Sequence, residues 1–287
     1  MTARRARAAL AAVFLSCIPT AHLVPPPAPA SAYTAKASQL NICGAYCHRP
    51  NKSNYRTKWG HDLLVFYVMS ENPAPWLVTA QETCGVQSWS VGSTLSSRGY
   101  LGRYFPTLGY NTVCQGSFGD SLWAIGPDVG GPGSFQFSAS TYDGQVLPDE
   151  KRQVGCQQKQ NFGFTWFGCV LHTVDTANGD PYAQAAEAAW VTGSTATRIV
   201  GGDFNVAPPV NNGWPNSWEA DQSLARTALL ATMSDTTLEN KIDYVFSPTA
   251  WFPASVGVTS CSTAAARSST AQYTDHCYLL STFSNSL

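Results

Sequence analysis

The sequence predicts a mixed α/β sandwich, and three features of the chain favour this fold class. Short segments rich in β-branched and aromatic residues recur along the chain, which is typical of strands. Helix candidates lie between only some of these segments, so the strict alternation of a barrel is missing. The strands at 76–78 and 244–246 are apolar at every position, which predicts that other layers cover both of their faces.

The individual elements follow from local composition. We expect strands at residues 39–43, 76–82, 121–125, 162–173, 197–204, 241–246 and 277–283. We expect helices at residues 61–69, 182–191 and 223–233. At the start of the second helix, Asp180 is suited to be the N-cap and Pro181 the first helical residue.

The first 32 residues have the features of a secretory signal peptide. Three arginines precede an apolar run at 8–18, and Ala-Ser-Ala at 30–32 offers a cleavage site. The apolar run is shorter than the roughly 20 residues that span a bilayer, so no transmembrane segment is expected. We therefore predict a signal peptide at 1–32, a single catalytic domain at 33–287 and an extracellular location, with the twin-arginine export route left open.

The mature chain is predicted to be mildly acidic. The signal peptide contains three of the 17 basic residues and none of the 18 acidic ones, so its removal leaves a net charge near −4. A protein that binds nucleic acid through its overall field would be basic. Any contact with a polyanion must therefore be local and assisted by a metal.

Cysteine usage points to an oxidising compartment. Cys17 leaves with the signal peptide, and eight cysteines remain, an even number that indicates disulfides. Of the 105 possible pairings, we expect the pairing of neighbours in sequence: 43–47, 84–114, 156–169 and 261–277. A zinc site is the alternative, and the lack of any C-x-x-C motif argues against it.

The segment Val-Gly-Gly-Asp-Phe-Asn at 200–205 places two polar side chains at the end of an apolar strand. Side chains alternate between the faces of a strand, so Asp203 and Asn205 are expected to point the same way. A carboxylate and an amide would then converge on one pocket. An Asx-rich turn that closes the strand is the alternative.

Other polar residues lie within or at the ends of apolar strands. Glu82 ends one such run, and its charge would need a metal or a salt bridge if buried. In Thr-Asp-His at 274–276, Asp275 can hold a cation while His276 meets a phosphate oxygen or water. Three more such residues are Asn41, His172 and Asp243. Asn41 and His172 taken alone are more often satisfied structural groups than ligands, whereas Asp243 is an acid that interrupts an apolar strand.

Taken together and in this order, these segments resemble the endonuclease/exonuclease/phosphatase superfamily, which includes the pancreatic-type deoxyribonucleases. The matching pieces are Leu-Asn-Ile at 40–42, Gln-Glu at 81–82, Leu-His-Thr at 171–173, Gly-Asp-Phe-Asn at 202–205, Ile-Asp-Tyr-Val at 242–245 and Thr-Asp-His at 274–276. They span nearly the whole mature chain. The resemblance implies a four-layer α/β/β/α sandwich with two mixed β-sheets packed face to face.

The resemblance also implies a metal site and a phosphate contact. Glu82 would be a ligand of a divalent metal, with Asn41 and Asp275 in the same environment. The implied cofactor is Mg²⁺, with Mn²⁺ or Ca²⁺ as alternatives. Arg152 falls near the position of a phosphate-binding arginine, although an exposed arginine fits the sequence equally well.

Five residues would carry the reaction by the same resemblance. Asp203 would orient or deprotonate the attacking water, and Asn205 would position phosphate and water. His276 would contact the scissile phosphate and share in acid–base work, while Asp243 orients one of the histidines. His172 would contact phosphate or assist the leaving group. The sequence departs from the family pattern at two positions: Gly-Asp at 119–120 stands where relatives often have Gly-Asn, and Leu171 where they often have Thr. These departures weaken the resemblance at Asp120 and at His172.

The sequence therefore predicts a secreted, Mg²⁺-dependent phosphodiesterase, first of all a DNase-like endonuclease. A phosphatase, or a phosphodiesterase acting on sphingomyelin or phospholipid, is the alternative with the same site. A catalytically silent binding or toxin subunit is the third hypothesis, and retention of the motif residues argues against it. Nucleic acid or another phosphodiester is the expected partner, and a monomer is the expected state.

Overall fold

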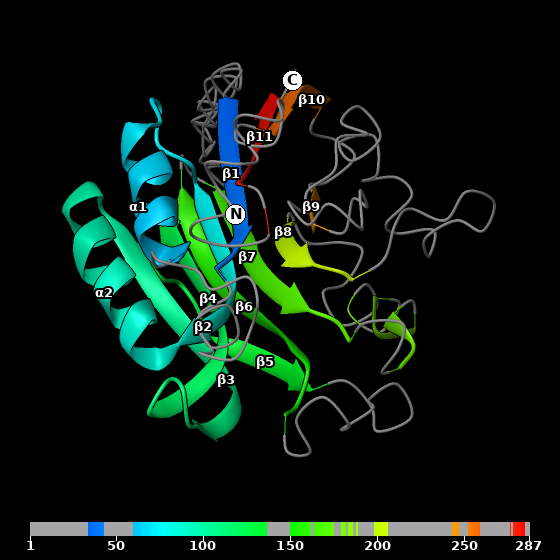
Figure 1. Ribbon diagram of the computed structural model, residues 1–287. Helices are drawn as coiled ribbons and strands as arrows, with labels where there is room; N and C mark the ends of the chain where they lie inside the picture. The colour runs from blue at the N-terminus through cyan, green and yellow to red at the C-terminus, as the bar shows by residue number, and fades with distance from the viewer. Residues whose placement is uncertain are drawn as a thin grey trace, which may run out of the picture. The chain divides into compact units, whose positions relative to one another are not determined.

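Two β-sheets and the helices beside them form the part of the chain that this computed structural model describes (Figure 1). The described residues are 34–42, 60–136, 150–161, 164–174, 179–181, 183–185, 188, 198–205, 243–246, 252–258, 276 and 278–284. They all belong to one compact unit, Ala32–Ser286. None of the described helices is long and apolar enough to cross a membrane.

The first sheet has six strands and is mixed. Its strands lie in the order β10 (Phe252–Val258), β11 (Leu279–Ser284), β1 (Thr34–Asn41), β2 (Leu77–Cys84), β4 (Gly116–Ile125) and β3 (Tyr100–Asn111). β1 and β2 are parallel, whereas the other neighbours are antiparallel. The parallel pair brings the carboxyl ends of β1 and β2 to the same edge of this sheet.

The second sheet has five strands and is also mixed. Its strands lie in the order β5 (Gly133–Gln136), β6 (Gln153–Asn161), β7 (Phe164–His172), β8 (Arg198–Asp203) and β9 (Asp243–Phe246). Only β7 and β8 are parallel. Each sheet thus has one parallel pair, and these two pairs carry most of the polar residues singled out in the sequence.

Buried side chains show how the layers are stacked. One apolar cluster, including Leu77, Phe105, Val170 and Ile199, draws on both sheets and fills the space between them. A second cluster packs α1 (Gly60–Ser70) and α2 (Gly85–Leu95) against the outer face of the six-stranded sheet.

A third cluster covers the outer face of the five-stranded sheet. It includes Ala185 and Ala188, which lie in a segment that is helical where the structure describes it. The predicted cap of that segment is confirmed, because Oδ1 of Asp180 accepts a hydrogen bond of 3.0 Å from the N–H of Ala183. The predicted α/β/β/α order of layers is therefore confirmed.

The sequence patterns found most of the central strands and the helix expected at 61–69, which is α1, but they missed other peripheral elements. The strands expected around residues 76–82, 121–125, 162–173, 197–204 and 241–246 are confirmed as β2, β4, β7, β8 and β9. α2 was missed because its sequence, GVQSWSVGSTL, is rich in glycine and serine, which are weak helix formers. It is helical because Val91 and Leu95 pack into the core. The helix expected at 223–233 lies outside the described residues.

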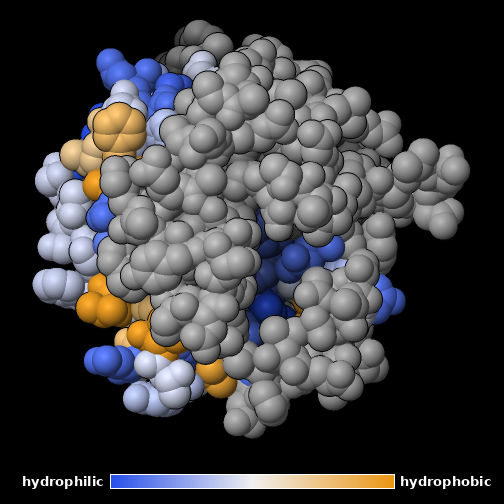
Figure 2. Space-filling model, in the orientation of Figure 1, coloured by the Kyte–Doolittle hydropathy of each residue, from blue (hydrophilic) through white to orange (hydrophobic). Residues whose placement is uncertain are grey.

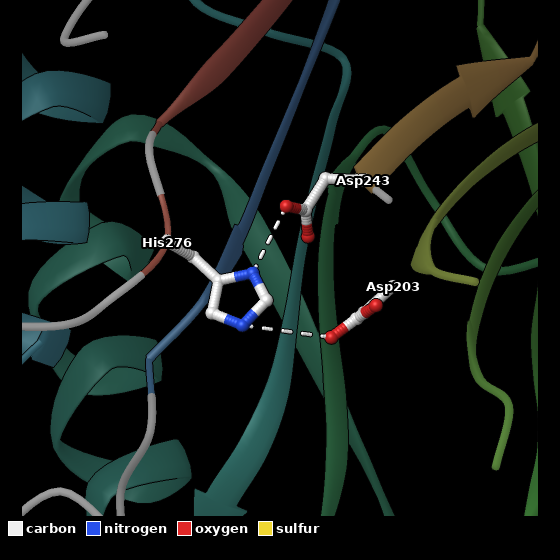
Figure 3. A group of neighbouring side chains, drawn as sticks. All are labelled: Asp203, Asp243 and His276. Atoms are coloured by element: carbon white, nitrogen blue, oxygen red, sulfur yellow. Dashed lines mark hydrogen bonds and ion pairs between the residues drawn. The ribbon is translucent and has the colours of Figure 1, made fainter. Parts of the chain in front are cut away.

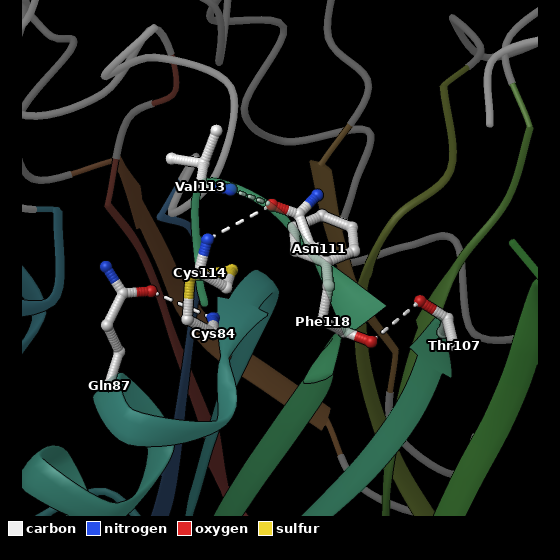
Figure 4. The surroundings of a disulfide bond; sticks show 7 residues. All are labelled: Cys84, Gln87, Thr107, Asn111, Val113, Cys114 and Phe118. Carbon is white, nitrogen blue, oxygen red and sulfur yellow. Dashed lines mark hydrogen bonds between the residues drawn. A yellow bond between two sulfur atoms is a disulfide. The ribbon is translucent and has the colours of Figure 1, made fainter. Parts of the chain in front are cut away.

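Two of the expected disulfides are confirmed. Cys84 pairs with Cys114, and Cys156 pairs with Cys169 between the adjacent strands β6 and β7. Figure 4 shows the first, which joins the end of β2 to the turn between β3 and β4. Oδ1 of Asn111 fixes that turn by accepting from the N–H groups of Val113 and Cys114. The pairs expected at 43–47 and 261–277 lie outside the described residues.

Glycines let the two sheets approach closely. A Cβ on Gly155 of β6 would lie 2.4 Å from ring atoms of Phe105 in β3, and one on Gly201 of β8 would lie 2.2 Å from Oγ1 of Thr79 in β2. Neither contact is possible for a real side chain. The sheets can therefore keep this spacing only with glycine at these positions.

We predict that Gly155→Ala lowers the free energy of unfolding by about 1–3 kcal/mol, because the rigid Phe105 ring must move to admit the methyl group. Urea denaturation followed by tryptophan fluorescence measures the change. Gly131→Ala is the control, since a Cβ at Gly131 would have no atom within 4 Å. Equal unfolding midpoints for the two variants would contradict this account of the sheet packing.

Candidate active site

Asn41 joins the ends of the two sheets. It is the last residue of β1 and is fully buried. Its Nδ2 donates to Oε1 of Glu82 at 3.1 Å and to Oδ2 of Asp203 at 3.0 Å. Glu82 belongs to β2 in the six-stranded sheet and Asp203 ends β8 in the five-stranded sheet, so one amide links carboxylates from both.

A bulge turns Glu82 out of regular strand geometry. The pairing of β2 with β4 shifts register between Ala80 and Thr83, and Glu82 has a φ of 55°. A residue other than glycine in this left-handed region costs about 1–3 kcal/mol, and such strain is common where a side chain is re-aimed at a functional site. The N–H of Glu82 donates to the carboxylate of Asp120 on β4, which holds the bulge in place.

Asp203 accepts hydrogen bonds from several directions. Its Oδ1 accepts from the N–H of Asn205 at 2.9 Å. Strand alternation does not apply to Asn205, because β8 ends at Asp203 and Asn205 has a φ of 51°. Instead, Nδ2 of Asn205 donates to the carbonyl of Thr173 at 2.8 Å, which ties the loop after β8 to the end of β7.

His276 lies between two carboxylates (Figure 3). Its Nδ1–H donates to Oδ2 of Asp243 at 2.9 Å, and its Nε2 lies 3.7 Å from Oδ2 of Asp203. The other oxygen of Asp243 accepts from Nε2 of Gln39 at 2.8 Å. Asp243 therefore fixes both the ring orientation and the tautomer of His276, leaving Nε2 directed toward Asp203.

His172 approaches the same carboxylate from the five-stranded sheet. It ends β7, and its Nε2 lies 3.5 Å from Oδ2 of Asp203. The guanidinium of Arg152 donates to Nδ1 of His172, which places the ring proton on Nε2. Burial, Arg152 and His276 together hold the pKa of His172 well below its ordinary value, so this imidazole is neutral.

Arg152, which donates to His172, is also surrounded by carboxylates. Its Nε lies 3.4 Å from Oε1 of Glu150, and its side chain is largely buried. Although burial opposes the charge, the carboxylates of Glu150, Asp120, Glu82 and Asp203 raise the pKa of Arg152 above its ordinary value. The exposed alternative for this arginine is therefore wrong, and its guanidinium lies within the cluster.

The sequence interpretation did not place Asp120, Glu150 or Gln39 in the site. Asp120 was noted only as a departure from Gly-Asn, yet it is buried beside Glu82 and Arg152. Burial raises the pKa of Asp120 well above its ordinary value, and Arg152 opposes this shift. The spacing of Gln39 and Asn41, two apart on one buried strand, was a signal that could have revealed Gln39.

The cluster offers a donor set that fits a divalent cation. The carboxylate of Glu82 and the amide oxygen of Asn41 are hard oxygen ligands, which suit Mg²⁺ or Ca²⁺. Burial and then Asp243 raise the pKa of Asp203 to about 7, as expected for crowded carboxylates that a cation would stabilise.

The side chains of Asp203, Asp243 and His276 also bring three ligand atoms within 4.8 Å of one another. We interpret this second group as a proton relay, because Asp243 already engages Nδ1 of His276.

Eight of the predicted site residues thus lie in one connected network. They are Asn41, Glu82, Arg152, His172, Asp203, Asn205, Asp243 and His276. The ninth, Asp275, lies outside the described residues. A recess with hydrophilic residues near the centre of the space-filling view lies where β7 and β8 end in Figure 1 (Figure 2).

Solved structures match the chain along most of its length, whereas no family model and no curated protein matches it. An endonuclease/exonuclease/phosphatase from Beutenbergia cavernae is 13% identical, with a TM-score of 0.63 over 87% of this chain and 71% of that one. The human Nocturnin catalytic domain, solved with bound sulfate, is 17% identical, with a TM-score of 0.58 over 88% of this chain and 94% of that one. The chain has the endonuclease/exonuclease/phosphatase fold.

A third structure with this fold carries a nucleotide ligand. ANGEL2, a 2′,3′-cyclic phosphatase solved with adenosine-2′,3′-vanadate, is 11% identical, with a TM-score of 0.58 over 89% of this chain and 97% of that one. The resemblance inferred from short motifs is thus confirmed at the level of the endonuclease/exonuclease/phosphatase fold.

We predict that the Asp203 carboxyl titrates near pH 7 in the metal-free protein and at lower pH in Asp243→Asn, because the variant removes a neighbouring negative charge. Added Mg²⁺ is expected to lower the midpoint in the same direction. Carbon-13 NMR of the carboxyl resonance measures it. Asp62→Asn, on the solvent side of α1, is the control and should leave the midpoint unchanged. An unaltered Asp203 midpoint in Asp243→Asn would refute the electrostatic coupling.

Proposed function

We propose that this protein is a secreted, divalent-metal-dependent phosphodiesterase, and that it acts as a DNase-like endonuclease. One observation carries the proposal: five residues from distant parts of the chain share one network of hydrogen bonds and ion pairs, namely Asn41, Glu82, His172, Asp203 and His276. The cluster lies in a protein with the endonuclease/exonuclease/phosphatase fold. Phosphodiester hydrolysis uses these elements, namely a cation site, a base and proton-bearing imidazoles.

Glu82 and Asn41 would hold the cation, with Asp275 expected beside them from the sequence. When bound, Mg²⁺ neutralises charge that develops on the phosphate oxygens. The remaining steps belong to the protein. Asp203, with a raised pKa and a buried position, is suited to take a proton from the attacking water.

The two histidines complete the proposed chemistry. The ring of His276 is oriented by Asp243, and in its protonated form it can donate from Nε2 to a phosphate oxygen. His172 is neutral and presents its Nε2–H near the same oxygen of Asp203, where it can donate to a phosphate oxygen or to the leaving group. Arg152 holds His172 in this tautomer and adds a fixed positive charge.

Two similar structures support a nucleotide-type substrate. One was solved with sulfate and another with adenosine-2′,3′-vanadate, so this fold can bind phosphate-like anions. The mature chain is expected to be acidic, so we propose that local contacts rather than the overall field hold the nucleic acid. The two disulfides support export to an oxidising environment, and we propose that the protein works there as a monomer.

The proposal is tested with purified protein incubated with supercoiled plasmid, RNA, sphingomyelin liposomes and a phosphomonoester, each with Mg²⁺ or EDTA. Mg²⁺-dependent nicking of plasmid is expected. Glu82→Gln should require a higher Mg²⁺ concentration for half-maximal rate, because it removes a charged ligand, while Asp62→Asn should behave like the wild type. Hydrolysis of lipid or phosphomonoester alone would reject the endonuclease, and inactivity on every substrate would favour a silent binding protein.

We predict that Asp243→Asn lowers kcat by about 10²–10⁴-fold with a much smaller change in KM, because it disorients the general acid–base His276. Activity should fall as pH drops through the pKa of Asp203, since the base must be ionised. In Asp243→Asn this acidic limb should move to lower pH, because a carboxylate that raises the Asp203 pKa is gone. A pH–rate profile of unchanged shape would show that Asp243 acts only on stability.

A further inference from the structure

A cleft lies between α2 and β3, on the outer face of the six-stranded sheet. Its volume is about 410 Å³, within the range of roughly 300–1,000 Å³ typical of small-ligand sites. We call it the α2–β3 cleft and define it by six of its lining residues: Ser88, Trp89, Gly92, Tyr100, Gly102 and Trp123. On the side where α2 lies in Figure 1, pale, weakly polar residues mix with orange apolar ones (Figure 2).

The indole of Trp123 contributes to the lining of the cleft. Trp123 of β4 is 1% exposed and packs in the cluster beneath α2. Its Nε1 lies beside two glycines that also line the cleft. An indole N–H is a hydrogen-bond donor only, so a ligand in the cleft would have to offer it an acceptor.

Two glycines uncover this donor. A Cβ on Gly92 of α2 would lie 3.1 Å from Nε1 of Trp123, and a Cβ on Gly102 of β3 would lie 2.8 Å from the same atom. Both glycines line the cleft. A side chain at either position would therefore cover the indole N–H, and glycine leaves it accessible from the cleft.

The wall of the cleft supplies a flat apolar surface and a hydroxyl. The side chain of Trp89 is 74% exposed, which is unusual for a tryptophan in a helix that packs on a sheet. Ser88 is only 7% exposed and also lines the cleft. A hydroxyl both donates and accepts, whereas an indole ring offers its face for stacking.

The charge of the lining argues against an anionic ligand. Arg103 is the one charged residue among the described lining residues. Its guanidinium is engaged by Oε1 of Gln157, a carboxylate oxygen of Asp128 and the carbonyl of Gly102. The cleft therefore offers stacking and neutral hydrogen bonds rather than a field that attracts phosphate.

We propose that the α2–β3 cleft is a carbohydrate-binding site that takes an uncharged pyranose oligosaccharide. The C–H face of a sugar ring stacks on Trp89, a ring or hydroxyl oxygen accepts from Trp123, and a sugar hydroxyl pairs with Ser88. The site uses none of the residues of the candidate active site. The cleft also includes Gly85, three residues after Glu82. Binding to a glycan would therefore keep the candidate active site close to the surface that bears the glycan.

Binding is tested on the full mature protein in EDTA, by isothermal titration calorimetry with cellohexaose, xylohexaose, mannohexaose and chitohexaose. At least one should bind with Kd below about 10 mM. Trp89→Ala should weaken that binding by about tenfold or more, because it removes the stacking surface. Gly92→Ala should weaken it similarly by covering the indole N–H, and a thermal melt checks that the variant folds like the wild type.

Two matched controls separate the cleft from general effects. Phe66→Ala removes an exposed aromatic ring from α1, and Thr94→Ala places alanine on an exposed position of α2 outside the cleft. Both should bind sugar like the wild type. The proposal is overturned if none of the four sugars binds, or if Trp89→Ala and Gly92→Ala bind as well as the controls. It is also overturned if an oligothymidylate, and no sugar, binds in a Trp89-dependent way.

Discussion

The candidate site depends on how a buried carboxylate is accommodated where the two sheets meet. Asp203 is 1% exposed, and burying its charge is costly unless donors surround it. Those donors come from both layers: the amide of Asn41 from the six-stranded sheet, and the N–H of Asn205 from the loop after β8. The relative position of the sheets is therefore part of the site, and glycines at the sheet interface help to fix it.

Two of the three described non-glycine residues with positive φ belong to the candidate site. Glu82 and Asn205 both have φ near +50°, one at a bulge and the other just beyond a strand. The conformation of Glu82 is held by the hydrogen bond from its N–H to the carboxylate of Asp120. That of Asn205 is held by the hydrogen bond from its Nδ2 to the carbonyl of Thr173. Such strain persists only where surrounding contacts determine the conformation, and it re-aims side chains that a regular strand would present elsewhere.

Charge is organised in layers around Asp203. Asp243 orients His276, and Arg152 does the same for His172, so each imidazole has one nitrogen occupied and the other directed at the same carboxylate. Glu150 in turn pairs with Arg152. As a result, the pKa of Asp203 is raised and that of His172 is lowered. Neighbouring groups with pKa values shifted by their surroundings are typical of acid–base catalysis.

The sequence by itself determined the central strands and the chemical types at their ends. Asn41, Glu82, His172, Asp203, Asp243 and His276 were found because polar residues in or at the end of apolar strands are conspicuous in a linear pattern. Only the tertiary structure decided that Asp120, Glu150 and Gln39 belong beside them and that Arg152 is buried. It also decided that the backbone N–H of Asn205 donates to Asp203 while its side-chain amide donates to the carbonyl of Thr173. The physical reason is that pairing, bulges and sheet packing are non-local: a sequence pattern gives the face and end of a strand, whereas the partner across the sheet comes from residues far away in the chain.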